Sequence, residues 1–147
     1  MIGLAAQVAF LVAASITPGM DFEDEPQPPE LRATSGGVTA TPTSGTYCRS
    51  TESEGICADA AYPLRVERLR VRRGGLITFT ADERLTSLHA CLETRRKRFF
   101  HCRRARGADE TWRVRLPRRL KRAERLSIDV TYPGGDGNYE LGLTIRA

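Results

Sequence analysis

The sequence predicts an all-β domain: an antiparallel β-sandwich of about seven strands, stabilised by disulfide bonds. Three observations lead to this prediction. Several segments alternate apolar and polar residues, turn-forming residues separate those segments, and the chain contains four cysteines. Alternation with a period of two is typical of half-buried strands, because successive side chains point to opposite faces of a sheet. Many short strands without a helical period favour a sandwich, in which each strand gives one face to a shared core.

Residues 1–17 predict a secretory signal peptide. The run MIGLAAQVAFLVAASI has no charged side chain and ends in small residues suited to cleavage. No Lys or Arg precedes this run, so an uncleaved N-terminal anchor and a cytosolic chain with an incidental apolar start stay open. A helix of about fifteen residues reaches only about 22 Å, short of a roughly 30 Å hydrocarbon layer. We therefore expect a secreted or extracytoplasmic protein, associated with the cell envelope and without a transmembrane span in the mature chain.

Residues 18–46 predict a flexible linker. This segment is acidic first, in DFEDEPQPPE, and then rich in Pro, Thr, Ser and Gly. It offers little apolar surface to offset the entropy lost on ordering. The β-sandwich is accordingly expected over residues 47–147.

The expected strands each present one apolar face. In the first of them Leu64 and Val66 share a parity that Leu69 and Val71 do not, which predicts a bulge or bend between Val66 and Leu69. The apolar faces of the later strands are Ile77 and Phe79; Leu88, Ala90 and Leu92; Trp112, Val114 and Leu116; Leu126, Ile128, Val130 and Tyr132; and Tyr139, Leu141, Leu143 and Ile145.

Turn chemistry separates these strands. The sequences RRGG at 72–75 and PGGDGN at 133–138 predict turns. Segment 116–126 has apolar residues at helical spacing, and predicts either a short helical turn or a plain loop. The stretch GDGNYEL is similar to the sequence before the tyrosine corner of immunoglobulin-like sandwiches, but it also fits a hairpin turn before the last strand. The subtype, immunoglobulin-like or jelly-roll-like, therefore stays open.

The four cysteines, Cys48, Cys57, Cys91 and Cys102, predict two disulfides, since an even number in an exported chain is typical of a disulfide framework. Three pairings are possible. The spacing favours Cys48 with Cys57 and Cys91 with Cys102, because each pair closes a short loop. A zinc site is the alternative, but the chain has no C-x-x-C pair. We expect no bound metal and no cofactor.

The opening GTYCRS…GICADA, followed by a β-rich chain, resembles uncharacterised exported all-β domains of Gram-positive bacteria. Those domains open with Gly-Ser/Thr-Tyr-Cys-Trp and carry a second Cys followed by Asp. Arg49 stands where the pattern has Trp, and the residues that match that opening are Gly45, Thr46, Tyr47, Cys48, Cys57 and Asp59. The resemblance implies export, β architecture and pairing of Cys48 with Cys57. It implies no activity.

The histidine content and the absence of catalytic motifs predict a non-enzymatic protein. Only His89 and His101 are present, and no nucleophile elbow, phosphate-binding loop or zinc-protease motif appears. If the cysteines are oxidised, no thiolate nucleophile remains. An enzyme whose site the sequence does not connect is the remaining alternative.

The region from Arg95 to Arg125 is the strongest candidate for a binding surface. It holds fourteen Lys or Arg against three acids, in a chain whose net charge is +5. A disulfide between Cys91 and Cys102 would make these charges project together and create a field of one sign. The predicted anion-binding residues are Arg95, Arg96, Lys97, Arg98, Arg103, Arg104, Arg113, Arg115, Arg118 and Arg119.

The partners expected for this surface are an anionic cell-envelope polymer or lipid headgroups, bound by a monomer that acts as a binding or structural module. Nucleic acid inside the cell is the alternative, with Phe99 and Phe100 stacking on bases. Two other interpretations stay open. The basic face is simply solvated, since a GC-rich genome also favours arginine, or the acidic linker folds back on it through weak exposed pairs.

Overall fold

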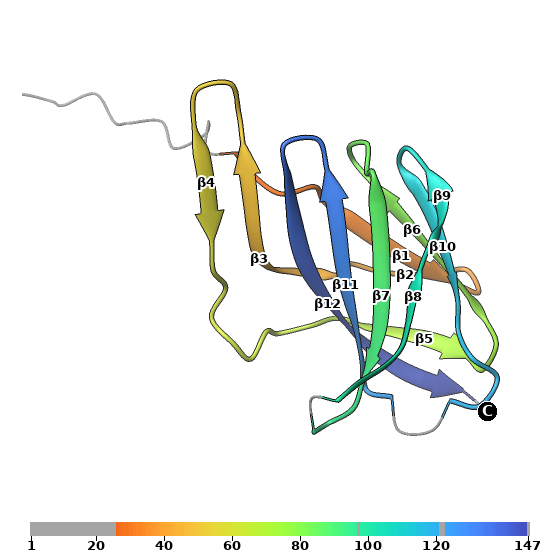
Figure 1. Cartoon of the computed structure of the whole chain (residues 1–147). Helices are drawn as coiled ribbons and strands as arrows, with labels where there is room; N and C mark the ends of the chain where they lie inside the picture. The colour runs from red at the N-terminus through yellow and green to blue at the C-terminus, as the bar shows by residue number, and fades with distance from the viewer. Residues whose placement is uncertain (1–25, 97, 121–122, 147) are drawn as a thin grey trace, which may run out of the picture.

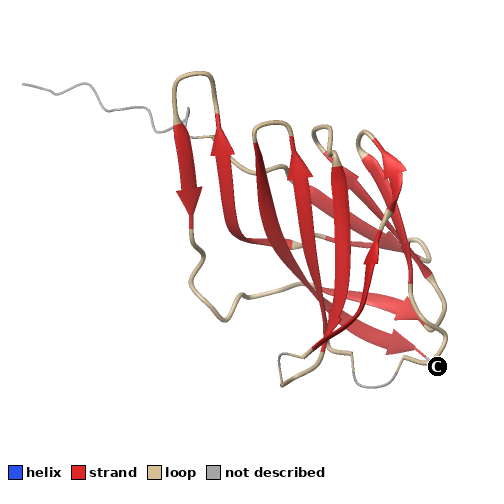
Figure 2. Cartoon of the chain, in the orientation of Figure 1, coloured by secondary structure: helices blue, strands red, loops and turns tan. Residues whose placement is uncertain are grey.

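A computed structural model describes residues 26–96, 98–120 and 123–146 of the chain. These residues form twelve strands in two sheets that lie one behind the other, joined by turns and loops without a helix (Figures 1 and 2). The predicted all-β sandwich with antiparallel sheets is therefore confirmed. The expected signal peptide lies outside the described residues.

The first sheet is fully antiparallel and has the strand order β2-β1-β6-β10-β9. Its strands are β1 (Leu31–Ser35), β2 (Val38–Ala40), β6 (Leu76–Ala81), β9 (Arg106–Ala108) and β10 (Thr111–Arg115). In Figure 1 this sheet lies behind the other one.

The second sheet has seven strands, six of them in the antiparallel order β4-β3-β12-β11-β7-β8. The long strand β12 pairs with β3 along its first half and with β5 along its second half, the latter in parallel. The strands are β3 (Thr43–Ser50), β4 (Gly55–Ala58), β5 (Arg68–Arg72), β7 (Ser87–Glu93), β8 (Phe99–Arg104), β11 (Arg125–Tyr132) and β12 (Gly135–Arg146).

The core lies between the two sheets. Ile77 and Phe79 of the first sheet, and Leu88, Ile128 and Leu141 of the second, are all fully buried in one hydrophobic cluster. The inward positions are the ones that the period-two alternation predicts for these strands. Burial of this apolar surface is the main favourable contribution to folding.

The predicted flexible linker over residues 18–46 is wrong for residues 31–46, which form β1, β2 and the start of β3. Leu31 and Ala33 are buried and pair with Ala81 and Phe79 of β6. Two or three apolar side chains at period two are enough to cover one face of a short strand, while the Thr, Ser and Gly around them dominate the composition. The sandwich therefore begins well before residue 47, and residues 18–25 lie outside the described part.

Three other local predictions concern the region between Val66 and Leu69, segment 116–126 and the turn at 72–75. The expected bulge between Val66 and Leu69 is absent, because residues 59–67 form an irregular loop and β5 begins only at Arg68. The described residues of segment 116–126 form a loop that leads to β11, so the plain-loop alternative holds for them. This loop contributes three side chains to the core, those of Leu116, Leu120 and Ala123. The turn at 72–75 is confirmed by a hydrogen bond from the Gly75 N–H to the Arg72 carbonyl (3.0 Å).

The strand count of about seven was too low because the missed strands are short or exposed. Strand β9 is three exposed residues, and β2 is three residues of which only Ala40 is buried. An edge strand with both faces near water shows no alternation, so the sequence pattern cannot reveal it.

Both predicted disulfides are confirmed. Cys48 is bonded to Cys57 across β3 and β4, and Cys91 to Cys102 across β7 and β8, with no free cysteine. Two disulfides suggest that the chain folds in an oxidising, extracytoplasmic environment. In the part of the chain that the structure describes, no helix is long and apolar enough to cross a membrane.

Candidate anion-binding groove

The Cys91–Cys102 hairpin contains a β-bulge that sets the direction of its arginines. Ala90 is opposite Arg103 and Leu92 is opposite Phe100, so one residue of β7 faces two residues of β8. The extra residue is accommodated at His101, which adopts a positive φ of 47°. A bulge of this kind changes which face each following side chain occupies. Arg103 consequently takes the register position beside buried Ala90, at the side where the two sheets meet.

The chain crosses from one sheet to the other directly after this hairpin. Ala105 is buried and donates its N–H to the Leu88 carbonyl of the second sheet (2.8 Å). The next residue, Arg106, begins β9 of the first sheet. Arg103 and Arg104 therefore lie at the edge of one sheet and Arg106 at the edge of the other, separated by a single residue.

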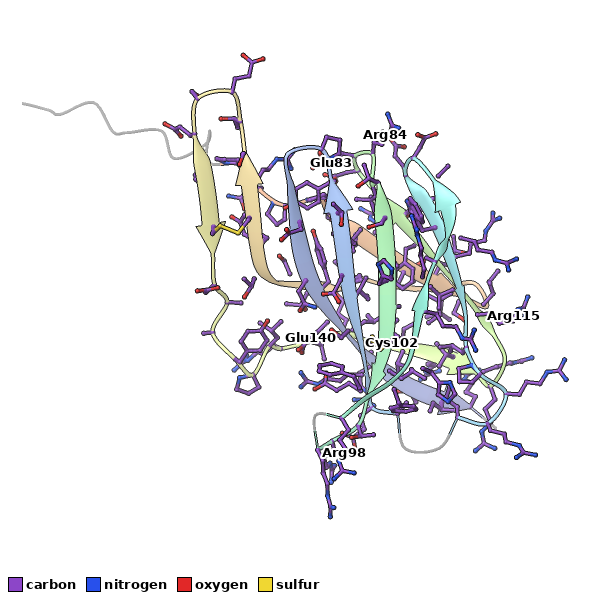
Figure 3. The ribbon with its side chains drawn as sticks, in the orientation of Figure 1. Glu83, Arg84, Arg98, Cys102, Arg115 and Glu140 are labelled. Carbon is purple, nitrogen blue, oxygen red and sulfur yellow. A yellow bond between two sulfur atoms is a disulfide. The ribbon has the colours of Figure 1, made fainter. Side chains whose placement is uncertain are left out.

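A groove of about 1020 Å³ lies along this crossing. Its walls are β8 on one side and β9 and β10 on the other, with Leu76 and Pro117 also lining it. Five arginines contribute to the lining: Arg103, Arg104, Arg106, Arg113 and Arg115. Figure 3 shows Arg115 at the right-hand edge of the molecule, among basic side chains that extend away from the sheets.

Within the part of the chain that the structure describes, little neutralises these charges. Arg115 donates from Nη1 to the Gly74 carbonyl (3.0 Å). Among the described residues, no carboxylate lies within 4.0 Å of the other four guanidinium groups. Arg106 and Arg113 are also directly opposite each other in the β9–β10 register. Like charges at directly opposite positions are destabilising, so this arrangement would be relieved by a bound anion.

The guanidinium group suits this role because it is planar, always charged, and able to donate two parallel hydrogen bonds to phosphate, sulfate or carboxylate. Several such groups in one open groove can bind successive anionic groups of a linear polymer. Local field and donor geometry both favour an anion here.

The structure separates the predicted basic surface into distinct parts. Arg95, Arg96 and Arg98 lie at the tip of the β7–β8 hairpin, where they line a different hollow and where Arg95 pairs with Glu124 (3.1 Å). Figure 3 shows Arg98 at the lower end of the molecule, well away from Arg115. The described members of the predicted set therefore do not form one continuous field.

Two further predicted residues lie outside the groove lining, one is not described, and one groove residue was missed. Arg118 and Arg119 are exposed in the loop that follows β10, and Lys97 lies outside the described residues. Arg106 was not predicted, although the run RRAR contains it. The sequence feature that could have identified Arg106 is Ala105, an apolar residue within the arginine run. Ala105 is buried at the place where the chain passes from one sheet to the other.

The described residues offer little for acid-base or metal chemistry. His89 and His101 are both exposed, and all four cysteines are oxidised. In the residues that the structure describes, no three His, Cys, Asp or Glu side chains are grouped closely enough to hold a metal ion. A comparison of the chain with protein-family models, curated proteins and solved structures finds no match.

Proposed function

We propose that this protein is a non-enzymatic, exported module of the cell envelope that binds an anionic polymer through the arginine groove defined by Arg103, Arg104, Arg106, Arg113 and Arg115. The observation that carries the proposal is the convergence of these five cations from three strands into one groove, where none of them has a carboxylate neighbour within 4.0 Å among the described residues. The oxidised cysteines support a site of action outside the cytoplasm.

A phosphate-bearing polymer fits the groove better than a single small anion. The groove is open and long enough to be lined by residues from β8, β9 and β10 together. A chain of regularly spaced phosphates would reach several guanidinium groups at once and release several counterions. Teichoic-acid-type polymers of the envelope have this chemistry.

Nucleic acid is less well supported, because single-strand binders combine positive charge with stacking aromatics. Phe100 is half-buried against the core, and Phe99 lines another hollow of the molecule. Neither ring lines the arginine groove, so the aromatic contribution expected for base stacking is missing there.

The test compares two triple variants that remove the same charge. In one, Arg103, Arg106 and Arg113 become Ser; in the other, Arg95, Arg96 and Arg98 of the hairpin tip become Ser. Binding of the oxidised full-length protein to poly(glycerol phosphate) is measured over a series of salt concentrations. The groove variant should bind at least about tenfold more weakly, and its log-log salt slope should fall by about 2, as expected for three lost phosphate contacts.

The tip variant should keep most of its affinity. Equal losses in the two variants would show that net charge, rather than the groove, determines binding. An unchanged affinity in the groove variant would remove the proposal.

A further inference from the structure

A second hollow, separate from the arginine groove, lies on the outer face of the seven-stranded sheet. Its volume is about 450 Å³, and it shares no lining residue with the groove. It lies over β7, β11 and β12, and the loop 59–67 and the start of β8 contribute to its walls. Glu140, labelled in Figure 3, comes from the middle of this sheet.

The floor of this hollow consists of polar side chains that are buried although they belong to an outer face. Glu93, Ser127 and Glu140 are exposed by only 7%, 8% and 9%. Their neighbours in the strands, such as Leu92 and Leu141, point into the core. The outer face is therefore covered at this place, and the polar groups lie at the bottom of a recess.

The floor contains hydrogen-bond donors and acceptors side by side. The guanidinium of Arg125 donates to Oε2 of Glu140 (2.6 Å). The amide of Asn138 donates to Oγ of Ser127 (3.1 Å) and to Asp129 (2.8 Å). These contacts hold the floor groups in a fixed arrangement, which lowers the entropy lost when a ligand binds.

The walls carry two exposed aromatic rings. Tyr62 and Phe99 are exposed by 51% and 59%, and they are two of the four large apolar residues exposed in the described chain. Phe99 is opposite Glu93 in the β7–β8 register. Tyr62 lies above Gly45 of β3, where an added Cβ would be 2.7 Å from the Tyr62 hydroxyl. The absence of a side chain at Gly45 thus makes room for this ring.

We propose that this hollow, lined by Tyr62, Glu93, Phe99, Arg125, Asn138 and Glu140, binds a pyranose unit of an uncharged glycan. Each sugar hydroxyl both donates and accepts, and the mixed floor of guanidinium, amide and carboxylate groups matches that requirement. The C–H faces of a pyranose ring pack against aromatic rings such as those on the walls. A hollow of this size is within the range of small-ligand sites.

Two other ligand classes fit less well. A quaternary ammonium would use the aromatic rings and the carboxylates, but it would lie beside the positive charge of Arg125. An anion would meet three carboxylates, those of Glu93, Glu124 and Glu140, against two guanidinium groups, those of Arg95 and Arg125, and both of these are already paired with Glu124 and Glu140. An uncharged ligand with several hydroxyls avoids both conflicts.

The test is titration calorimetry of the oxidised full-length protein with three trisaccharides and one cation. The trisaccharides are those of β-1,4-linked glucose, α-1,4-linked glucose and β-1,4-linked N-acetylglucosamine, and the cation is tetramethylammonium. We expect saturable binding of at least one trisaccharide. Phe99→Ser should weaken that binding at least about tenfold, because it removes one aromatic wall. Val38→Ser, which replaces an exposed apolar residue elsewhere, should leave it unchanged.

A second variant tests the geometry without changing any group in the hollow. Gly45→Ala places a methyl group 2.7 Å from the Tyr62 hydroxyl and 3.3 Å from the carbonyl and side-chain oxygens of Asn138. It should therefore shift the Tyr62 ring and crowd Asn138, and weaken trisaccharide binding at least about threefold, within the cost of a disturbed aromatic contact. The proposal is overturned if none of the three trisaccharides binds saturably, if Phe99→Ser or Gly45→Ala binds as tightly as the unaltered protein, or if tetramethylammonium alone saturates the site.

The two sites are tested independently. The variant with Ser at positions 103, 106 and 113 should keep full trisaccharide affinity, and Phe99→Ser should keep full affinity for poly(glycerol phosphate). Either proposal can therefore fail while the other holds.

Discussion

At the scale of single residues, Arg49 connects three segments that are distant in the sequence. Its guanidinium forms two hydrogen bonds with the carboxylate of Glu83 (2.5 and 2.8 Å) and one with the Gln27 carbonyl (2.6 Å). It also lies over the ring of Tyr132, 5.2 Å from the centroid. The hydrogen bond and charge of Glu83 raise the pKa of Arg49.

We expect Glu83→Gln to lower the free energy of unfolding by about 1–2 kcal/mol. Hydrogen bonds to charged groups contribute about 1.5–3 kcal/mol, and solvent reduces that value because the side chains of Arg49 and Glu83 are 22% and 31% exposed. The measurement is urea unfolding. The neighbouring Arg84→Gln is the control, since its pair with Asp109 is long (3.6 Å) and exposed. Equal effects of the two substitutions would contradict a structural role for Arg49.

Tyr139 is a second residue with a long-range role. It is buried in the core, and its hydroxyl donates to the Pro29 carbonyl, which anchors the segment before β1. Burial raises the pKa of Tyr139, because the phenolate would be desolvated. Burial also raises the pKa of Tyr132, against the opposing charge of Arg49.

These shifts predict a loss of stability at alkaline pH. A tyrosine whose pKa is raised by folding contributes its stability fully below the unfolded pKa of about 10, and that stability falls as the pH rises above it. Each such group contributes up to about 1.4 kcal/mol per pH unit. Tyr139→Phe should therefore flatten the decrease in unfolding free energy between pH 10 and 11, without abolishing it, because Tyr132 remains. The measurement is chemical unfolding at each pH in a buffer without thiols, so that the disulfides stay intact. If Tyr139→Phe left the dependence of the unfolding free energy on pH unchanged, this account would be contradicted.

At the scale of elements, the stability of β8 depends on its pairing with β7 more than the stability of a core-facing strand depends on any one neighbour. It lies at the edge of its sheet, five of its six residues are exposed, and only Phe100 packs against the core. A strand with so little buried apolar surface has little energy to offset its ordering. The Cys91–Cys102 disulfide supplies that constraint, and it thereby holds Arg103 and Arg104 in the groove.

Replacing both Cys91 and Cys102 with Ser should lower the free energy of unfolding by about 2–3 kcal/mol, the chain-entropy value for a loop of this length. It should also accelerate amide hydrogen exchange in β8 and weaken polyanion binding. The control is the double replacement of Cys48 and Cys57 with Ser. Their disulfide closes a loop of similar length between β3 and β4. The control should lose comparable stability and keep polyanion binding. Slow exchange in β8 without its disulfide would contradict this dependence.

At the scale of the whole molecule, the first strand belongs to the core. Leu31 is 1% exposed and pairs with β6, and the neighbouring Pro29 accepts the hydrogen bond of Tyr139 from the opposite sheet. The N-terminal segment thus contacts both layers of the sandwich. Segment 29–35 is therefore part of the sandwich and not a linker to it.

We expect Leu31→Ala to lower the free energy of unfolding by about 3 kcal/mol, within the range measured for buried leucines. Val38→Ala, at an exposed position of β2, should cost less than about 0.5 kcal/mol. Both values are measured by chemical denaturation. A negligible effect of Leu31→Ala would restore the interpretation of this region as a linker.

The class of fold and the two disulfides could be predicted from local patterns in the chain. Alternation at Leu126, Ile128 and Val130 identifies a strand whatever its partner, because side-chain direction in a strand depends only on parity. Short loops between cysteines likewise favour local pairing. The edge strand β9 gave no pattern, since all three of its residues are exposed, and Leu31 and Ala33 were masked by the polar residues around them.

Which arginines lie together depends on how the two sheets pack. Arg103 and Arg113 belong to different sheets, and they line one groove because a bulge at His101 and a crossing at Ala105 bring the two sheet edges together. The recess between Tyr62 and Phe99 likewise depends on a loop folding over Gly45. Strand order and register arise from the packing of distant segments, so no local pattern of residues encodes which surface groups become neighbours.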